Sequence, residues 1–283
     1  MVFRSKQSQH SINLSNIHIA VKMMSNSVNH CLCEKELFST IGALQKERPE
    51  SVIYQTSLMS ALLSGVYEGN ITVAELLEKG DFGLGTFNRL DGELIAFDSE
   101  VYQLRSDGSA REAELQQKTP FAVMTFFQPQ YQHRFSAPVS RQSVHEVIDS
   151  QVTSDNQFCA LRIEGMFSSA QIRTVPCQQR PYRSMPEVLG QQPVFHFTHR
   201  QGTLIGFRTP QFMQGINVAG YHEHFITDDR QGGGHLLDYQ LEEGVLTFGE
   251  ISRLVIDFPG DSDFLTTNLQ PQGLDSAIRS VEG

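Results

Sequence analysis

Short apolar segments separated by turn-forming dipeptides are the feature of this sequence that most constrains its fold. Asp91-Gly92 separates residues 85–89 from residues 93–97, and Asp107-Gly108 follows the apolar segment 101–104. An Asp-Gly pair between two such segments favours a tight β-hairpin, because aspartate and glycine tolerate the backbone angles of the turn. Strands should therefore outnumber helices.

Later segments extend this pattern. Residues 158–163 and 170–175 are predicted to form two strands. Residues 194–199 and 203–208 are predicted to form a hairpin around Gln201-Gly202, a dipeptide typical of turns.

A few short helices are expected between the strands. Thr72 and Glu75 have the spacing of a capping box, and Gly80 can end a helix in the left-handed conformation, so residues 73–79 are predicted to be helical. Residues 143–151 carry apolar side chains at helical spacing and predict a second helix. The expected fold class is α+β, with mostly antiparallel β-sheets and a few short helices.

The length of the chain, 283 residues, fits one large or two modest domains. The composition changes near residues 181–193, where prolines cluster, and this change predicts the domain boundary. We expect an N-terminal α/β domain at residues 34–190 and a C-terminal β-rich domain at residues 191–283.

Residues 1–33 contain no Asp or Glu and are expected to be a poorly ordered leader. A start codon placed upstream of Met23 or Met24 would account for them equally well, and an organelle-targeting leader is the remaining alternative. The four cysteines lack the spacing of a zinc knuckle or a redox motif, so we expect reduced thiols and a cytoplasmic location.

The charge balance and hydropathy limit the partners. The chain has 22 Lys and Arg against 32 Asp and Glu, a formal net charge of −10, which disfavours binding to nucleic acid. It has no apolar run near the length of about 20 residues that spans a bilayer, so no membrane partner is expected. The glycines at 80, 83 and 85 follow a predicted helix instead of opening one, which argues against dinucleotide binding.

Three of the ten histidines lie between residues 222 and 235. Side chains alternate faces along a strand, so His222 and His224 point the same way and Glu223 points the other way. A hairpin centred on residues 229 and 230 places His235 opposite His224. Three imidazoles on one face are typical of a catalytic zinc site, although other divalent transition metals also accept them. The alternative is a pair of strand histidines on a solvated face, with the third placed by chance.

Several segments form an ordered set along the chain: YQTSLMSALLSGVYEG (54–69), GDFGLGTF (80–87), LDGE (90–93), FRTP (207–210), GINVAGYHEH (215–224), GGGH (232–235) and AIRSVE (277–282). Individually the glycine-rich segments are weak signals, whereas the ordered set is specific. It resembles the bacterial acetolactate decarboxylase family, and the resemblance covers residues 51–282.

The resemblance implies a carboxy-lyase that converts 2-acetolactate to acetoin and CO2 through a zinc-stabilised enediolate, in acetoin and butanediol fermentation. It implies that Zn2+ is bound by His222, His224 and His235. It also implies catalytic roles for Arg173, Glu93 and Glu282, and it leaves open which of these three delivers the proton. The resemblance also implies an α+β fold of two sheet-rich domains with mixed or antiparallel β-sheets, and a cytoplasmic homodimer. The implied catalytic residues are Arg173, Glu93 and Glu282, and the implied metal ligands are His222, His224 and His235.

Two other functions remain compatible with three converging histidines. A metal-dependent hydrolase, such as a lactonase, would use the same metal to activate water and would release no CO2. A non-catalytic metal-binding or ligand-sensing module would turn over nothing. Formation of acetoin from 2-acetolactate separates the three.

Overall fold

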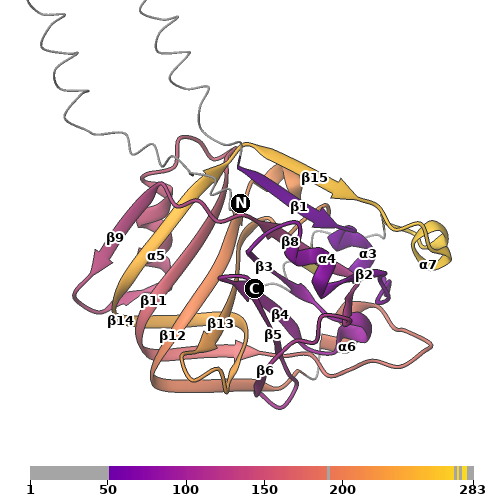
Figure 1. Ribbon diagram of the computed structural model, residues 1–283, viewed down its shortest axis with the longest axis horizontal. Coiled ribbons are helices and arrows are strands. Elements are labelled where there is room, and N and C mark those ends of the chain that lie inside the picture. The colour runs from indigo at the N-terminus through magenta and orange to yellow at the C-terminus, as the bar shows by residue number, and fades with distance from the viewer. Residues whose placement is uncertain (1–50, 190–191, 271–272, 274–275, 279–283) are drawn as a thin grey trace, which may run out of the picture. The chain divides into compact units, whose positions relative to one another are not determined.

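Two β-sheets with a shared apolar core between them form the framework of the protein (Figure 1). The computed structural model describes residues 51–189, 192–270, 273 and 276–278, all of them within the unit Glu50–Gly283. The predicted leader, residues 1–33, lies outside the described residues. Within the described part of the chain, no helix combines the length and the apolar character that crossing a membrane requires.

The first sheet has seven strands in the order β15-β1-β8-β3-β4-β5-β6. Only the β15–β1 pair among these is parallel, so the sheet is mixed. Its strands are β1 (Val52–Thr56), β3 (Phe82–Thr86), β4 (Glu93–Phe97), β5 (Glu100–Leu104), β6 (Ala110–Glu112), β8 (Phe121–Thr125) and β15 (Arg253–Asp257).

The predicted hairpin around Asp91-Gly92 is confirmed. β3 and β4 are antiparallel, with Thr86 paired to Glu93, and Gly92 has a φ of 83°, in the left-handed region where glycine is favoured. Side chains alternate between the two faces of β4: Ile95 faces the second sheet, whereas Leu94 faces the opposite core. This alternation sets which face of β4 meets the second sheet.

The second sheet has six strands, and four of them pair in a closed ring. β14 pairs with β11, β11 with β12, β12 with β13, and β13 again with β14, while β9 and β10 also pair with β14. A small third sheet joins β2 (Ile71–Thr72) to β7 (Lys118–Thr119). The strands of the second sheet are β9 (Tyr131–Phe135), β10 (Val139–Ser140), β11 (Phe158–Arg173), β12 (Val194–Thr209), β13 (Gly220–Thr227) and β14 (Gly233–Ile251).

Two sequence predictions in this sheet are wrong in the same way. Residues 158–175 do not form two strands, because β11 continues through register shifts near Phe167 that bend it without ending it. β12 likewise runs straight through Gln201-Gly202, so no hairpin forms there. Gly202 serves close packing instead of a turn, because a Cβ atom at this position would lie 2.5 Å from the ring of Phe225.

The expected boundary at residue 190 falls within this second sheet. The strands on its two sides, β11 and β12, pair along most of their length, from Cys159 with Arg208 to Arg173 with Val194. The chain passes from the first sheet to the second between β8 and β9, and β15 returns to the first. The division of the chain into folding domains at residue 190 stays a prediction.

Short helices cover the edges of the sheets. The capping box of α4 is confirmed: the Glu75 backbone N–H donates to Thr72 Oγ1 at 3.2 Å, and the Thr72 N–H donates to Glu75 Oε2 at 2.8 Å. The second predicted helix is α5, with Val144 and Ile148 buried. The helices are α3 (Met59–Leu63), α4 (Val73–Leu77), α5 (Arg141–Asp149), α6 (Met185–Leu189), α7 (Ser262–Thr266) and the 3-10 turns η2 (Asn88–Leu90) and η3 (Gln211–Met213).

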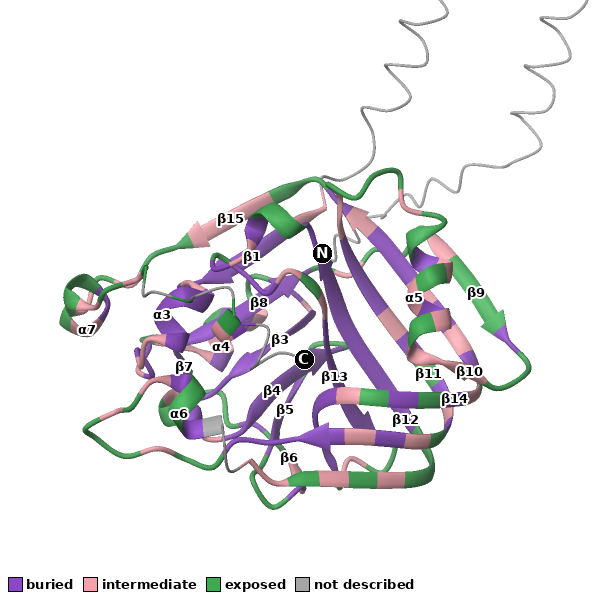
Figure 2. Cartoon of the chain, turned by 180° about the vertical axis from the view of Figure 1, so that it is seen from behind, coloured by how far each residue is buried: buried purple, intermediate pink, exposed green. Residues whose placement is uncertain are grey.

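Burial along the strands shows which face of each sheet packs against a core. Figure 2 shows buried residues along the central strands of both sheets, and exposed residues on α5, α7 and the outer strand β9. On β13, Ile226 belongs to the core between the sheets, whereas Phe225 belongs to the core that includes α5. The even-numbered side chains of β13 therefore face the first sheet. The observed architecture confirms the predicted α+β class.

Candidate metal centre

The predicted convergence of His222, His224 and His235 is confirmed. In the β13–β14 hairpin His224 lies directly opposite His235, the register that the sequence predicts. The ring centroids are 5.1 Å apart for His222 and His224, 5.1 Å for His222 and His235, and 5.5 Å for His224 and His235. Each ring offers a nitrogen, and the three nitrogens lie within 4.8 Å of one another, so the group could hold a metal ion.

All three imidazoles are buried, with exposed fractions of 7% for His222, 0% for His224 and 2% for His235. Burial, reinforced by the positive charge of Arg173, lowers the pKa of His222 to about 3. Burial and the neighbouring His222 lower the pKa of His224 well below its usual value. Both rings are therefore neutral near pH 7, which is the form that coordinates a metal.

A hydrogen bond to the first sheet sets the tautomer of His224. Its Nδ1 lies 2.8 Å from the carbonyl oxygen of Leu94, and since a carbonyl only accepts, Nδ1–H is the donor. The lone pair of Nε2 is then directed into the centre, and this buried atom has no hydrogen-bond partner among the described residues. A metal ligand needs this arrangement: a buried imidazole whose outer N–H is held by a carbonyl. The residues present therefore fit a metal ion.

Glu93, the first residue of β4, lies beside the three histidines. Its Oε2 lies 3.9 Å from His224 Nε2, and the residue is 9% exposed. The Asp91-Gly92 turn places Glu93 at the end of the hairpin that faces the second sheet, and the adjacent Leu94 carbonyl holds His224. One short segment of the first sheet thus supplies both a carboxylate and a support for the histidine.

Arg173 enters the centre from the last residue of β11, where it is paired in register with His235. It is 5% exposed, and its Nη1 donates to Gln192 Oε1 at 3.1 Å. Its charge reaches the imidazoles, since it contributes to the lowered pKa values of both His222 and His224. The structure therefore brings together five of the six residues named from the sequence. Glu282 lies outside the described residues, and its position stays a prediction.

Apolar side chains complete the pocket that these polar groups line. They come mainly from α3, α6 and the first sheet, and some of them, such as Met59 and Leu62, lie in segments that carry the family resemblance. No role was predicted for them, because an apolar residue carries no chemical signature of its own. Such a wall excludes water and strengthens electrostatic interactions inside the pocket. The lining residues are Met59, Leu62, Gly85, Thr86, Leu90, Glu93, Phe121, Arg173, Val175, Met185, His222 and His235.

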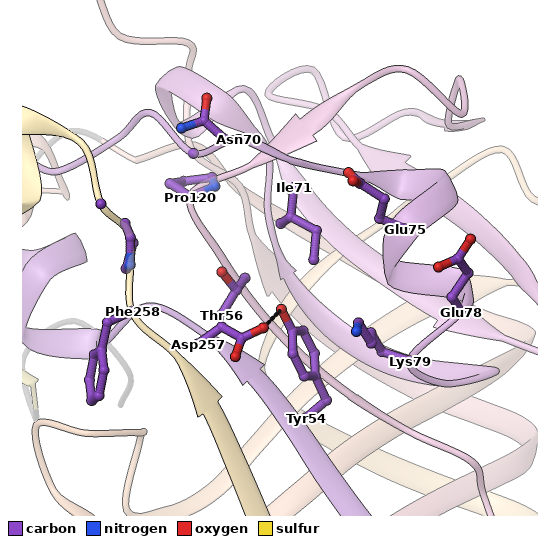
Figure 3. Close-up of a pocket in the computed structure, with 13 residues that line it drawn as sticks. Tyr54, Thr56, Asn70, Ile71, Glu75, Glu78, Lys79, Pro120, Asp257 and Phe258 are labelled. Carbon is purple, nitrogen blue, oxygen red and sulfur yellow. Dashed lines mark hydrogen bonds between the residues drawn. The ribbon is translucent and has the colours of Figure 1, made fainter.

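A second cleft lies beside α4 and β15, away from the histidines (Figure 3). Two contacts join its lining residues: Tyr54 Oη donates to Asp257 Oδ2 at 2.9 Å, and Lys79 Nζ lies 5.2 Å from the centre of the Tyr54 ring. None of the five site residues that the structure describes lines this cleft, so the candidate chemistry is assigned to the histidine pocket.

Comparison with known proteins agrees with this geometry. A sequence profile of the family "Alpha-acetolactate decarboxylase" matches residues 53–271. The chain is 69% identical to an alpha-acetolactate decarboxylase of Klebsiella aerogenes over 92% of this chain and 99% of that protein. It is 44% identical to one of Bacillus subtilis strain 168, over 84% of this chain and 94% of that protein.

Solved structures show the same fold. The crystal structure of alpha-acetolactate decarboxylase from Bacillus subtilis strain 168 superposes with a TM-score of 0.81 at 43% identity, covering 82% of this chain and 100% of that one. A Staphylococcus aureus protein described as similar to alpha-acetolactate decarboxylase superposes with a TM-score of 0.79 at 30% identity, over 82% of this chain and 100% of that one. This chain belongs to the alpha-acetolactate decarboxylase family.

Proposed function

We propose that this protein decarboxylates 2-acetolactate to acetoin and CO2, using a zinc ion held by His222, His224 and His235. The observation that carries the proposal is the convergence of three buried imidazoles with Glu93 and Arg173 on one pocket, in a chain of this family. Zinc is proposed because three protein ligands with an open further position are typical of its catalytic sites.

The proposed reaction requires the pocket to stabilise a developing negative charge and to deliver a proton. When the bond to the carboxylate breaks, its electron pair moves onto the carbon between the hydroxyl and the ketone and spreads to the ketone oxygen. When bound, the zinc ion supplies Lewis-acid stabilisation of the negative charge that develops there. The product then needs one proton on carbon, which a positioned side chain must deliver.

Arg173 is proposed to orient the substrate and to donate hydrogen bonds to the developing charge. Its guanidinium is buried at the end of β11 and offers donors in a planar fork that matches a carboxylate. Strong binding of the substrate carboxylate would stabilise the substrate more than the transition state. Hydrogen bonds from Arg173 that strengthen as the enediolate charge develops favour the reaction instead.

Glu93 and Glu282 are proposed to hold and move protons. Oε2 of Glu93 lies 3.9 Å from His224 Nε2, and this short distance supports a role for the carboxylate beside the proposed metal. Glu282 is proposed on the resemblance of the C-terminal segment 277–282 to the family. Because two carboxylates near one cation titrate together, the proton transfer is assigned to the pair.

The apolar wall is proposed to receive the two methyl groups of 2-acetolactate and to exclude water. Met59 and Leu62 from α3 and Met185 from α6 line this pocket. A homodimeric assembly and a cytoplasmic location are proposed on the family resemblance alone, and the mass of the native protein in solution tests the former.

Product analysis tests the proposed reaction. Purified protein loaded with zinc is incubated with 2-acetolactate, and acetoin and CO2 are measured against the spontaneous rate. Equal amounts of acetoin and CO2, formed faster than without enzyme, are expected. No acetoin above the spontaneous rate would overturn the decarboxylase assignment. Cleavage of a lactone without release of CO2 would point to the hydrolase alternative.

A further inference from the structure

A buried ion pair lies directly behind the three histidines. Glu223 sits between His222 and His224 in sequence but points to the opposite face of β13, and its side chain is 0% exposed. Its Oε2 accepts from Arg141 Nε at 2.7 Å, and its Oε1 accepts from His145 Nε2 at 3.0 Å. Neither partner belongs to the pocket of the proposed reaction.

Both partners lie on one polar stripe along α5, together with Asp149. Arg141, His145 and Asp149 are spaced by four residues, so they lie on the same face of the helix. The His145 ring stacks on Tyr221, with centroids 3.6 Å apart and planes 5° from parallel. Tyr221 and Glu223 share the outer face of β13. The polar stripe of α5 is therefore matched to the face of β13 that does not carry the histidines.

Arg141 also reaches the other strand of the metal hairpin. Its Nη1 donates to the carbonyl oxygen of Leu237 at 3.0 Å, two residues after His235 on β14. One guanidinium therefore joins the strand that carries His222 and His224 to the strand that carries His235. A lysine could keep the charge, but its single ammonium group could not reproduce this forked contact.

The ion pair is withdrawn from water: the Glu223 side chain is 0% exposed, and that of Arg141 is 19% exposed. Moving an ion pair out of water is costly, and well-packed apolar side chains would often stabilise such a position as well or better. A buried pair at this place therefore calls for a role in specifying geometry.

We propose that the Arg141–Glu223 pair is a positioning device that fixes the β13–β14 hairpin, so that the three imidazoles keep the spacing a metal ion requires. This inference rests on the proposed metal-binding function and adds to it residues that touch neither metal nor substrate. The device acts through two strands at once: removing it lets β13 and β14 shift relative to each other, and the metal site loosens.

The test compares metal affinity in the full-length protein with that of variants at both members of the pair. Zn2+ dissociation constants are measured by competition with a chelator, and the Co2+-loaded proteins are compared by their visible absorption spectra. For Arg141→Lys and Glu223→Gln we expect about 10- to 100-fold weaker Zn2+ binding, the range typical of residues that support metal ligands, and an altered Co2+ spectrum. Arg141→Lys guards against the case in which Glu223→Gln fails to fold.

Asp149→Asn is the matched control. At the other end of α5, Asp149 Oδ1 accepts from Arg208 Nε at 2.6 Å and from Tyr221 Oη at 2.9 Å. Asparagine keeps an accepting oxygen there but loses the charge, so the variant weakens the same helix without touching Glu223. Unchanged zinc affinity is expected for this control. Wild-type affinity and an unchanged Co2+ spectrum in Arg141→Lys would overturn the positioning role, as would equal losses in Asp149→Asn. Failure of the wild-type protein itself to bind zinc would contradict the proposed function instead.

Discussion

His224 donates a hydrogen bond from Nδ1 to the carbonyl oxygen of Leu94 at 2.8 Å, and this bond joins the two sheets at the candidate metal centre. It directs Nε2 of the same ring toward the centre, where Glu93 Oε2 lies 3.9 Å away. Because Glu93 and Leu94 are consecutive residues of β4, the support for the histidine and the carboxylate beside it are set by one strand. The geometry of the site therefore depends on how the first sheet packs against the second.

Glu93→Gln should separate catalysis from metal binding. The amide keeps the shape of the side chain but cannot take up or release a proton, so we expect kcat to fall by about 100-fold or more while zinc remains bound. Acetoin formation at saturating substrate and zinc content by elemental analysis measure the two effects. Glu112→Gln, an exposed residue of β6, is the control and should leave both unchanged. Full turnover in Glu93→Gln would remove Glu93 from the proton-transfer groups.

Arg173→Lys should lower the efficiency of the reaction without abolishing it. Lysine keeps the positive charge but loses the planar fork, and a hydrogen bond to a charged group contributes about 1.5–3 kcal/mol, so kcat/KM should fall about 10- to 100-fold. Arg162→Lys is the control, because Arg162 pairs with Asp98 away from the pocket. Equal kcat/KM values for wild type and Arg173→Lys would show that only the charge of Arg173 matters.

The sequence predicted the hairpin register of the site because local rules decide it. Strand alternation and a turn centred on residues 229 and 230 are enough to place His224 opposite His235. The same rules failed at Gln201-Gly202, where glycine is required by the close approach of the Phe225 ring and no turn forms. Sequence alone does not show which distant side chain will pack against a glycine.

The convergence of Glu93 and Arg173 on the histidines lies beyond local rules. These residues belong to β4 and β11 in different sheets, and their meeting depends on the packing of the core between the sheets. Only the resemblance to the family identified them. The proposed support from α5 was missed for a related reason: polar residues spaced by four along a helix are also typical of an exposed helix face.

Gly234→Ala should weaken both folding and metal binding. A Cβ atom there would lie 2.5 Å from Ile172 Cδ1 and 2.6 Å from the carbonyl oxygen of Arg173, so β14 must move away from β11 next to His235. Overpacking of this kind costs about 1–3 kcal/mol, which urea unfolding would detect, and zinc affinity should fall with it. Gly260→Ala is the control, since a Cβ atom there meets nothing within 4 Å. Wild-type stability in Gly234→Ala would contradict the close packing of β14 on β11.

Removal of residues 282 and 283 should abolish most turnover and leave the metal in place. If Glu282 shares the proton-transfer role with Glu93, its loss should lower kcat by about 100-fold or more, whereas the three histidine ligands are untouched. Steady-state kinetics and bound zinc are measured on the truncated protein. Deleting only Gly283 is the control and should have no effect. Full turnover in the truncated protein would remove Glu282 from the site.

The dependence of turnover on added zinc tests the central claim most directly. Metal-free protein is titrated with Zn2+ while acetoin formation from 2-acetolactate is followed, in parallel with His224→Ala. The account predicts that activity rises linearly and stops rising at one zinc per chain, and that His224→Ala neither retains zinc nor exceeds the spontaneous rate. Full activity in the metal-free protein, or normal turnover by His224→Ala, would contradict it.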